Sequence, residues 1–437
     1  MSNDVQIKLY FEGSEGSSFV SNQNIESFQL YGSFTDTSYD TLSLNLLSVH
    51  NPAELEPRTR PLQPVRLELN SRVAFIGRIL SRSFGDDGTI SIQCGDYRSD
   101  LVRSFVDPSI RINKGESLEN TILKIVEPFG VTSIEHGFGD FKNAITPEAN
   151  ENNFSKNFNP SQLKVQQRKA ENSEGAYEML LRYCERAGCV PQVSDARTKL
   201  SLATPAYNQD ATFWVRRENI GTDQGFSNVT SATLTEDYTA TPSVMISTCR
   251  SFSERGQASK GTQKTLELFS SKSSYPLGRN YRLSDGSNIR SRTGSDEYDP
   301  GPIVQAGRVK PGHASDPQTA YFPLYIDSKE SKTQEELDEL VHKKASNALK
   351  STFVLKYTFP FIGQEPLQDD LGNASTGYLG GIFMYDTIFH VKDDVFGINN
   401  DFYCSARTIS YSSAQGTSAS VDLIIKDIWL GEFSSSD

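Results

Sequence analysis

Apolar and polar residues alternate along the first hundred positions of the chain. Val, Leu and Ile occupy every second position at residues 5–9, 42–46, 65–69 and 90–92. This spacing predicts short strands that each bury one face. Asp86-Asp87-Gly88 separates two such segments and supplies the residues of a tight hairpin turn, where glycine accepts a positive φ. We therefore expect residues 1–108 to form a first β-barrel domain, because a small closed barrel leaves no strand edge exposed.

The apolar spacing lengthens to three and four residues within residues 109–208. Ser117 is placed to cap the N-terminus of a helix that ends at Gly130. The apolar face of this predicted helix consists of Leu118, Ile122, Ile125, Val126 and Phe129. A second helix is predicted to end at Gly188, and its apolar stripe consists of Met179, Leu180, Tyr183, Cys184 and Ala187. A hairpin at residues 191–205 follows, so this range is expected to be an α/β domain.

Strand patterns resume near residue 209 and continue towards the C-terminus. Short strand-like segments occur at residues 213–217, 228–235, 243–252, 351–359, 385–396, 402–414 and 419–429. Thr333 and Glu336 form a capping box that opens one further helix. We expect residues 209–253 and 316–437 to form a second β-barrel domain that contains this helix. The predicted fold class is α+β and β-rich, with two similar small barrels and an intervening α/β domain.

Two stretches lack a clear pattern. Residues 140–168 are polar and Asn-rich, which predicts a long surface excursion. Residues 254–315 are rich in Ser, Gly and Arg and are interpreted as a polar basic insertion. From Arg250 to Lys310, eleven Lys and Arg residues stand against six Asp and Glu residues. We favour a solvated loop, and the alternative is an arm that docks on an acidic neighbouring subunit or on DNA.

Length and charge narrow the function classes. At 437 residues the chain is too long for one ordinary core, so several packed units are expected. The formal net charge of -12 argues against tight binding to nucleic acid phosphates, and it would suit a surface that DNA slides past. No apolar stretch of about 18 residues occurs, and the N-terminus lacks the basic and apolar regions of a secretory signal. These features predict synthesis in the cytoplasm and no stable membrane insertion.

No catalytic, cofactor-binding or metal-binding residue is predicted. The chain contains no GxSxG, Walker or strand-linked GxGxxG motif. The cysteines are odd in number and scattered, which predicts unpaired structural thiols rather than zinc ligands or disulfides. They are Cys94, Cys184, Cys189, Cys249 and Cys404. The histidines are also scattered, which argues against a metal site: His50, His136, His313, His342 and His390.

Two acid pairs and two tryptophans are further candidates for a site. Asp369-Asp370 and Asp393-Asp394 are the candidate acid pairs for a glycosidase or a calcium site, and we interpret both as turn residues. Trp214 and Trp429 flank strands, and we interpret them as core or subunit-contact aromatics rather than as sugar-stacking platforms.

Four passages of the chain carry a resemblance to a known family. They are the opening VQIKLYFEG, residues 64–102, residues 173–195 and residues 228–252. Within residues 64–102, Phe75-x-Gly77 precedes a strand that ends in Gly95-Asp96-Tyr97. In this order the elements resemble the Mu-type baseplate hub proteins of phage tails, also described as late-control or tail hub proteins. The basic segment and residues 364–380 are longer than the family pattern.

The resemblance implies a non-enzymatic structural protein of the virion that needs no cofactor. It implies a homotrimer in which two barrels per subunit form a pseudo-sixfold ring, so that a sixfold tail tube rests on a threefold central spike. The implied partners are the spike, the tail tube or distal tube-end protein and the baseplate wedge proteins, with DNA passing through the lumen of a contractile tail. The alternatives are a trimeric receptor-binding adhesin and a cell-wall hydrolase with an unrecognised site.

Overall fold

The chain divides into two compact units, which are described separately. The computed structural model describes residues 6–13, 16–20, 24–34, 39–47, 59–69, 72–113, 115–136, 168–169, 174–187, 189–193, 198–203, 205, 210–223, 225–237, 244–249, 262–267, 323–327, 353–360, 366–368, 374–378 and 386–425. The first unit comprises Met1–Phe213, Tyr357–Thr387 and Cys404–Asp422, and the second comprises Trp214–Lys356, Ile388–Tyr403 and Leu423–Asp437. Strands predominate among the described residues and helices are few, so the fold is β-rich α+β, as the sequence predicts. The domain boundaries drawn from the sequence stay predictions.

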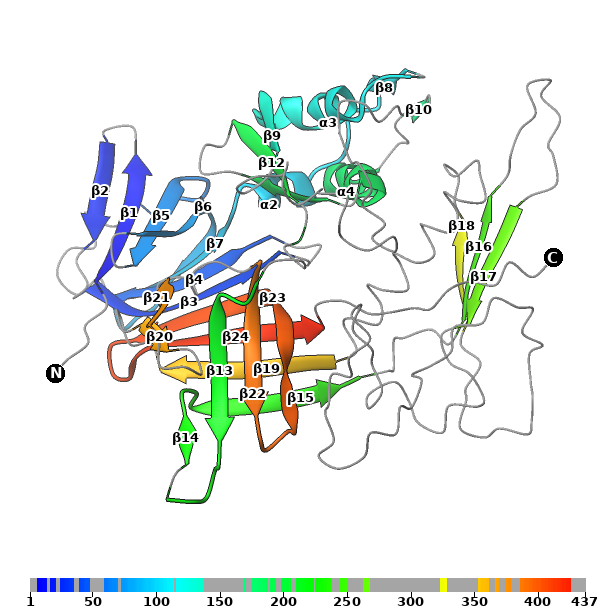
Figure 1. Cartoon of the computed structure of the whole chain (residues 1–437). Coiled ribbons are helices and arrows are strands. Elements are labelled where there is room, and N and C mark those ends of the chain that lie inside the picture. The colour runs from blue at the N-terminus through cyan, green and yellow to red at the C-terminus, as the bar shows by residue number, and fades with distance from the viewer. Residues whose placement is uncertain are drawn as a thin grey trace. The chain divides into compact units, whose positions relative to one another are not determined.

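An antiparallel sheet forms a large part of the first unit (Figure 1). Its strand order is β23-β3-β4-β7-β6-β5-β1-β2. The strands are β1 (Ile7–Gly13), β2 (Gly16–Val20), β3 (Ile25–Ser33), β4 (Thr41–Leu47), β5 (Pro64–Leu69), β6 (Arg72–Phe84), β7 (Thr89–Gly95) and residues 404–412 of β23 (Ile398–Ser412). Every neighbouring pair in this order is antiparallel.

The alternating sequence pattern becomes the burial pattern of this sheet. Every second residue of β4 and of β5 is buried. Leu44 of β4 lies opposite Ile92 of β7, and both side chains belong to the core. The hairpin predicted between β6 and β7 is confirmed, because Gly88 has a φ of 81° and Asp87 Oδ1 accepts a hydrogen bond of 2.9 Å from Thr89 N.

Three helices follow the first strands of this unit. The short helix α2 (Arg98–Val102) comes directly after β7 and was not predicted. Helix α3 (Leu118–Val126) continues into the 3-10 turn η2 (Glu127–Phe129), and α4 (Ala176–Ala187) is the second predicted helix. Ser117 Oγ accepts a hydrogen bond of 3.2 Å from Asn120 N, and Gly130 closes the helix end with a φ of 88°. The predicted cap and stop of α3 are therefore confirmed.

The apolar faces of α3 and α4 share one core with a small sheet. Ile122 of α3 and Leu180 of α4 are both fully buried in it. The sheet has the order β11-β12-β9, with β11 (Val190–Val193), β12 (Lys199–Ala203) and β9 (Ser133–His136). The predicted hairpin is β11 with β12, while β9 joins β12 in parallel, which the sequence reading missed. A two-stranded pair, β8 (Arg111–Ile112) with β10 (Arg168–Lys169), lies in the same unit.

The second unit contains the sheet order β14-β13-β22-β23. Its strands include β13 (Phe213–Glu218) from Trp214 onward, β14 (Phe226–Ser227), β15 (Ser231–Glu236) and β22 (Thr387–Asp393) from Ile388 onward. Residues 398–403 of β23, the start of β19 (Phe353–Pro360) and the end of β24 (Gly416–Ile425) also belong to it. The strand-like segments predicted on both sides of the insertion are confirmed as strands.

A separate three-stranded sheet in the second unit has the order β17-β16-β18 (Figure 1). Its strands are β16 (Val244–Cys249), β17 (Thr262–Glu267) and β18 (Pro323–Asp327). Strand β17 falls within residues 254–315, where the sequence predicted only a polar insertion. In the first unit, β20 (Pro366–Gln368) pairs with β21 (Ala374–Tyr378). The helix predicted from Thr333 and nearly all of residues 140–168 lie outside the described residues.

Within the described part of the chain, none of the helices has the length and apolar character needed to cross a membrane.

Candidate functional site

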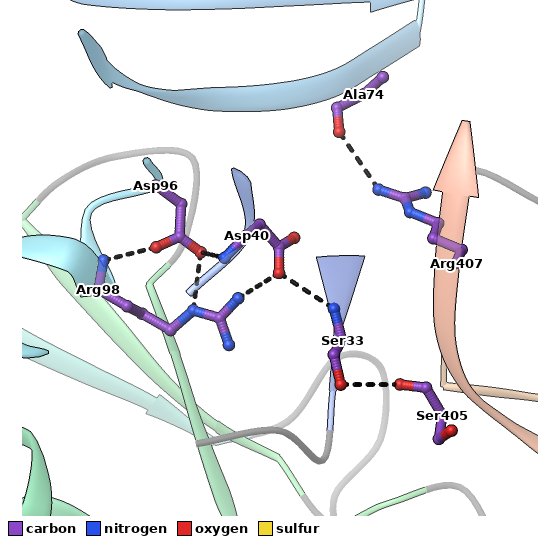
Figure 2. Close-up of polar contacts among 7 residues, drawn as sticks. All are labelled: Ser33, Asp40, Ala74, Asp96, Arg98, Ser405 and Arg407. Carbon is purple, nitrogen blue, oxygen red and sulfur yellow. Dashed lines mark hydrogen bonds and ion pairs between the residues drawn. The ribbon is translucent and has the colours of Figure 1, made fainter. Parts of the chain in front are cut away.

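A buried arginine organises the junction between β7 and α2. Arg98 is only 1% exposed, and it contacts two carboxylates (Figure 2). Its Nε lies 2.7 Å from Asp96 Oδ2, and its Nη2 donates to Asp40 Oδ1. The backbone N of Arg98 also donates to Asp96 Oδ1 at 2.8 Å. Asp96 thus binds both the side chain and the main chain of Arg98, which fixes the first turn of α2.

The same acids hold the ends of neighbouring strands. Asp40 N donates to Asp96 Oδ2 at 3.1 Å, and Asp96 N donates to the Asp40 carbonyl at 3.0 Å. Ser33 N donates to Asp40 Oδ1 at 3.3 Å, and Ser33 Oγ donates to the Ser405 carbonyl at 3.2 Å (Figure 2). We call Ser33, Asp40, Asp96, Arg98 and Ser405 the Arg98 cluster. It ties β7, β4, β3 and β23 together inside the first unit.

A very close backbone approach lies beside the Arg98 cluster. A Cβ added to Gly77 would overlap the carbonyl oxygen of Gly95 and would lie 2.8 Å from Phe75 Cζ. A Cβ added to Gly95 would lie 2.8 Å from Tyr39 Cε2 and 2.9 Å from Ser99 Cβ. Only glycine fits both positions, because real Cβ atoms do not approach other atoms this closely. This packing is the physical reason for Phe75-x-Gly77 and Gly95-Asp96-Tyr97.

The electrostatics of the Arg98 cluster are those of two carboxylates around one guanidinium. Burial raises the pKa of Asp96 to about 6, the Arg98 charge opposes this rise, and the Asp40 charge adds to it. Both oxygens of Asp96 accept hydrogen bonds from the protein. The Asp96 carboxylate therefore has a structural role in the Arg98 cluster, because its oxygens bind the protein and are not open to a substrate. Where the structure is described, no group of three or more His, Cys, Asp or Glu side chains could hold a metal ion.

In the second unit, the turn after β13 and the turn after β22 are joined by hydrogen bonds. Asp393 Oδ1 accepts hydrogen bonds from Val395 N at 2.9 Å and Phe396 N at 3.1 Å, and Asp393 Oδ2 lies 3.3 Å from Arg217 Nη1. Asp394 Oδ2 accepts from Asn219 N at 2.9 Å, in the turn that follows β13. The Asp393-Asp394 pair thus lies at the turn between β22 and β23 and binds backbone amides. This confirms its interpretation as turn residues.

Solved structures share this fold over almost the whole chain. The tail protein from Neisseria meningitidis MC58 matches with a TM-score of 0.62 at 13% identity, covering 98% of this chain and 99% of that one. The 43 kDa tail protein of prophage MuSo2 from Shewanella oneidensis matches with a TM-score of 0.57 at 15% identity, covering 97% and 99%. The chain has the fold of these tail proteins. No family model matches the sequence, and no curated protein matches it either.

The resemblance seen in the sequence is therefore confirmed at the level of fold. Three of the passages that carried it contain described elements of this fold. The opening VQIKLYFEG contains β1, and Phe75-x-Gly77 and Gly95-Asp96-Tyr97 meet at the close β6–β7 approach. Residues 173–195 supply α4 and β11.

Four cysteine thiols in the described part of the chain are buried. Cys94, Cys184, Cys189 and Cys404 are all free and buried. Burial strongly raises the pKa of the Cys94 and Cys404 thiols, which makes them poor nucleophiles. Cys189 Sγ lies 3.5 Å from the Cys184 carbonyl oxygen, a contact that belongs to the packing after α4. The predicted fifth thiol, Cys249, is part of β16.

The histidine and tryptophan candidates are not brought together among the described residues. His390 lies on β22, with Nδ1 2.8 Å from Asp401 Oδ1 and Nε2 3.1 Å from Asn399 Oδ1. His136 ends β9, and Trp214 is half-buried on β13. The remaining candidates lie outside the described residues: His50, His313, His342, Trp429 and Asp369-Asp370.

Sequence reasoning missed the Arg98 cluster. It identified Gly95-Asp96-Tyr97 only as part of a family pattern and assigned no role to Asp40 or Arg98. The signal available was the Asp96-x-Arg98 spacing directly after a strand, where an acid can cap the following turn. Its partner Asp40 is 58 residues away from Arg98 in sequence, a separation that no local pattern bridges.

Proposed function

We propose that the chain is the structural hub of a phage tail baseplate. The observation that supports this most is the match to two tail proteins over 98% and 97% of this chain and 99% of each of theirs. The match covers both chains end to end, so it concerns the whole architecture and not one common module, and the proposed role rests on this likeness of fold. The location that follows is the virion, at the end of the tail.

The proposed assembly is a homotrimer with an open centre. Each copy would contribute two β-barrels, one for each predicted barrel domain, and three copies would then present six similar faces around a threefold axis. A sixfold tail tube can rest on such a ring, and a threefold central spike can be held beneath it. The partners are the spike, the tube or its distal-end protein and the wedge proteins of a contractile baseplate.

The proposed role involves no catalysis and no cofactor. Asp96 of the Arg98 cluster and Asp393 of the turn accept hydrogen bonds from backbone amides of the protein, which suits a structural role. DNA would leave through the centre of the ring without specific binding, in keeping with a formal net charge of -12.

Mass photometry and negative-stain electron microscopy of the purified chain test this proposal. We expect particles of three copies that form a ring with an open centre. Compact monomers at every concentration up to the micromolar range would contradict the proposed hub, and an elongated fibre-like trimer would favour the adhesin.

A further inference from the structure

One leucine of the first unit is held in a backbone conformation that suits glycine. Leu62 has a φ of 70° and is 60% exposed. It follows Pro61, and Gln63 N donates to the Arg60 carbonyl at 3.2 Å. Proline at the second position and a positive φ at the third define a type II turn, whose third position favours Gly or Asn. An exposed leucine at this position is unfavourable in two ways. Its Cβ disfavours the positive φ, and its apolar side chain contacts water.

This Leu62 turn (residues 60–63) is fixed against β6. Leu62 N donates to the Ile79 carbonyl at 2.7 Å, and Ile79 N donates to the Gln63 carbonyl at 3.0 Å. The Gln63 side chain accepts from Arg60 N at 3.1 Å. The bonds on both sides of Leu62 fix the backbone of the turn, and the Leu62 side chain is exposed on it. On a fixed backbone only the rotamers of the side chain itself are ordered on binding, which suits an interface anchor.

The second unit presents a matching feature at its pair of turns. We call residues 219–223 and 394–397 the loop tip. Ile220 is 46% exposed and Val395 is 51% exposed. The two turns that carry them are joined, because Asn219 N donates to Asp394 Oδ2, and each apolar residue directly follows one of these partners. Turn residues are usually polar, so two exposed aliphatic side chains on joined turns indicate a contact surface.

Hydrogen bonds hold the backbone of the loop tip, as they do that of the Leu62 turn. Asp393 is fully buried and binds two amides of its own turn, and the guanidinium of Arg217 lies beside it. Asp394 N donates to the Arg217 carbonyl at 3.0 Å, which joins the two turns a second time. Ile220 and Val395 therefore lie on turns whose backbone is held by hydrogen bonds within the second unit.

The two surfaces are complementary in charge. The charged residue of the Leu62 turn is Arg60, which is exposed. The charged residues of the loop tip are Asp223 and Asp394, and both are exposed. One surface is therefore aliphatic and basic, and the other is aliphatic and acidic. The two surfaces lie on different units of the chain.

We infer that the loop tip of one copy packs on the Leu62 turn of the next copy, with Asp223 facing Arg60. The inference rests on the homotrimer proposed above and names the residues that join its subunits. Since the two halves are different surfaces, the contact is head-to-tail, the type of contact that forms a closed ring of three copies when the rotation between copies is threefold. The apolar side chains supply the anchor, and the charge pair at the rim selects the register.

Leu62→Gly separates assembly from folding. Glycine accepts the positive φ at this position, so the variant keeps or gains thermal stability, whereas loss of the anchor weakens trimer association about tenfold or more. Phe105→Ser removes another exposed apolar side chain, 68% exposed, and serves as the matched control. Equal weakening by both variants, or no weakening by Leu62→Gly, would overturn the inference.

A charge exchange tests the register. Sedimentation of Asp223→Lys and Arg60→Glu alone is expected to show weakened trimers, and a chain that carries both changes is expected to recover association. Wild-type trimers with unaffected single variants would overturn the assigned contact and leave the proposed hub intact. A wild-type chain that stays monomeric would overturn both, so the two failures are distinguishable.

Discussion

Arg407 Nη2 donates a hydrogen bond of 3.2 Å to the carbonyl of Ala74, which lies 333 residues earlier in the chain. Beside it, Ser33 Oγ donates to the Ser405 carbonyl across 372 residues. Strand β23 pairs with β3, and the Arg407 side chain reaches from it to Ala74 of β6. The first unit is therefore completed by the C-terminal part of the chain, and its N-terminal residues alone lack one strand of their sheet.

Replacement of Arg407 tests how much this long-range contact stabilises the fold. Arg407→Met keeps the aliphatic stem and removes the donor to Ala74, at a buried position. We expect the free energy of unfolding to fall by about 1–3 kcal/mol, because a buried acceptor loses its bond. Urea unfolding measures it, and exposed Arg103→Met is the control with little expected change. Equal losses in both variants would contradict the assigned role.

The close approach of Gly77 and Gly95 predicts a steric penalty at Gly77. Gly77→Ala forces β6 away from β7, and we expect a loss of about 3 kcal/mol, the upper end of the range for overpacked cores. Gly221→Ala is the contrast, since its Cβ meets open space and only the positive φ of 91° is penalised, by about 1 kcal/mol. Thermal unfolding of both variants checks the ranking. A milder effect at Gly77 than at Gly221 would show that the strands yield easily.

The raised pKa of Asp96 predicts a pH-dependent stability. Its pKa is about 6 in the folded chain against an ordinary 3.8, so the folded state binds more protons than the unfolded state between these values. The stability from this group is fully present below about pH 4 and is lost as the pH rises through about 6. Asp96→Asn removes the effect, so relative to wild type it gains about 1–3 kcal/mol as the pH rises over this window.

Asp87 provides the control of opposite sign. Hydrogen bonds from Thr89 lower the pKa of Asp87, so its contribution is present above its ordinary pKa and is lost on acidification. Asp87→Asn is therefore expected to lose stability relative to wild type as the pH rises from acid. Urea unfolding at several pH values compares the two variants. The same trend in both would exclude the assigned burial of the Asp96 carboxylate.

The cap of α3 predicts a small local effect. Ser117→Ala removes the acceptor for Asn120 N and is expected to cost about 1 kcal/mol. Ser117→Asp keeps an acceptor and adds a negative charge at the helix N-terminus, so it is expected to retain most of the stability. Circular dichroism during thermal unfolding measures the difference. Equal stability of the Ala and Asp variants would rule out the cap.

Local chemistry explains which parts of the fold were predictable. Ser117, Gly130 and Asp86-Asp87-Gly88 act within a few residues of themselves, so their types alone indicate a cap, a stop and a turn. The alternation at Leu42, Leu44 and Leu46 likewise reports one buried face of one strand. These elements are confirmed because each depends on neighbours in sequence.

Long-range partners explain what was missed. The sequence cannot show that Arg98 binds Asp40, that β9 joins β12 in parallel, or that Asp393 forms an ion pair with Arg217. Each contact joins segments that come together only after the intervening chain has folded. Strand β17 was missed for a different reason, because its residues TQKTLE are polar and read as loop.

Electron cryomicroscopy of intact tails that carry a tagged copy of this chain tests the central claim most directly. The account predicts three tags arranged around the channel axis at the end of the tube, between the sixfold tube and the threefold spike. Tags along the tube, on peripheral fibres, or absent from purified tails would contradict the assignment of this chain as the hub.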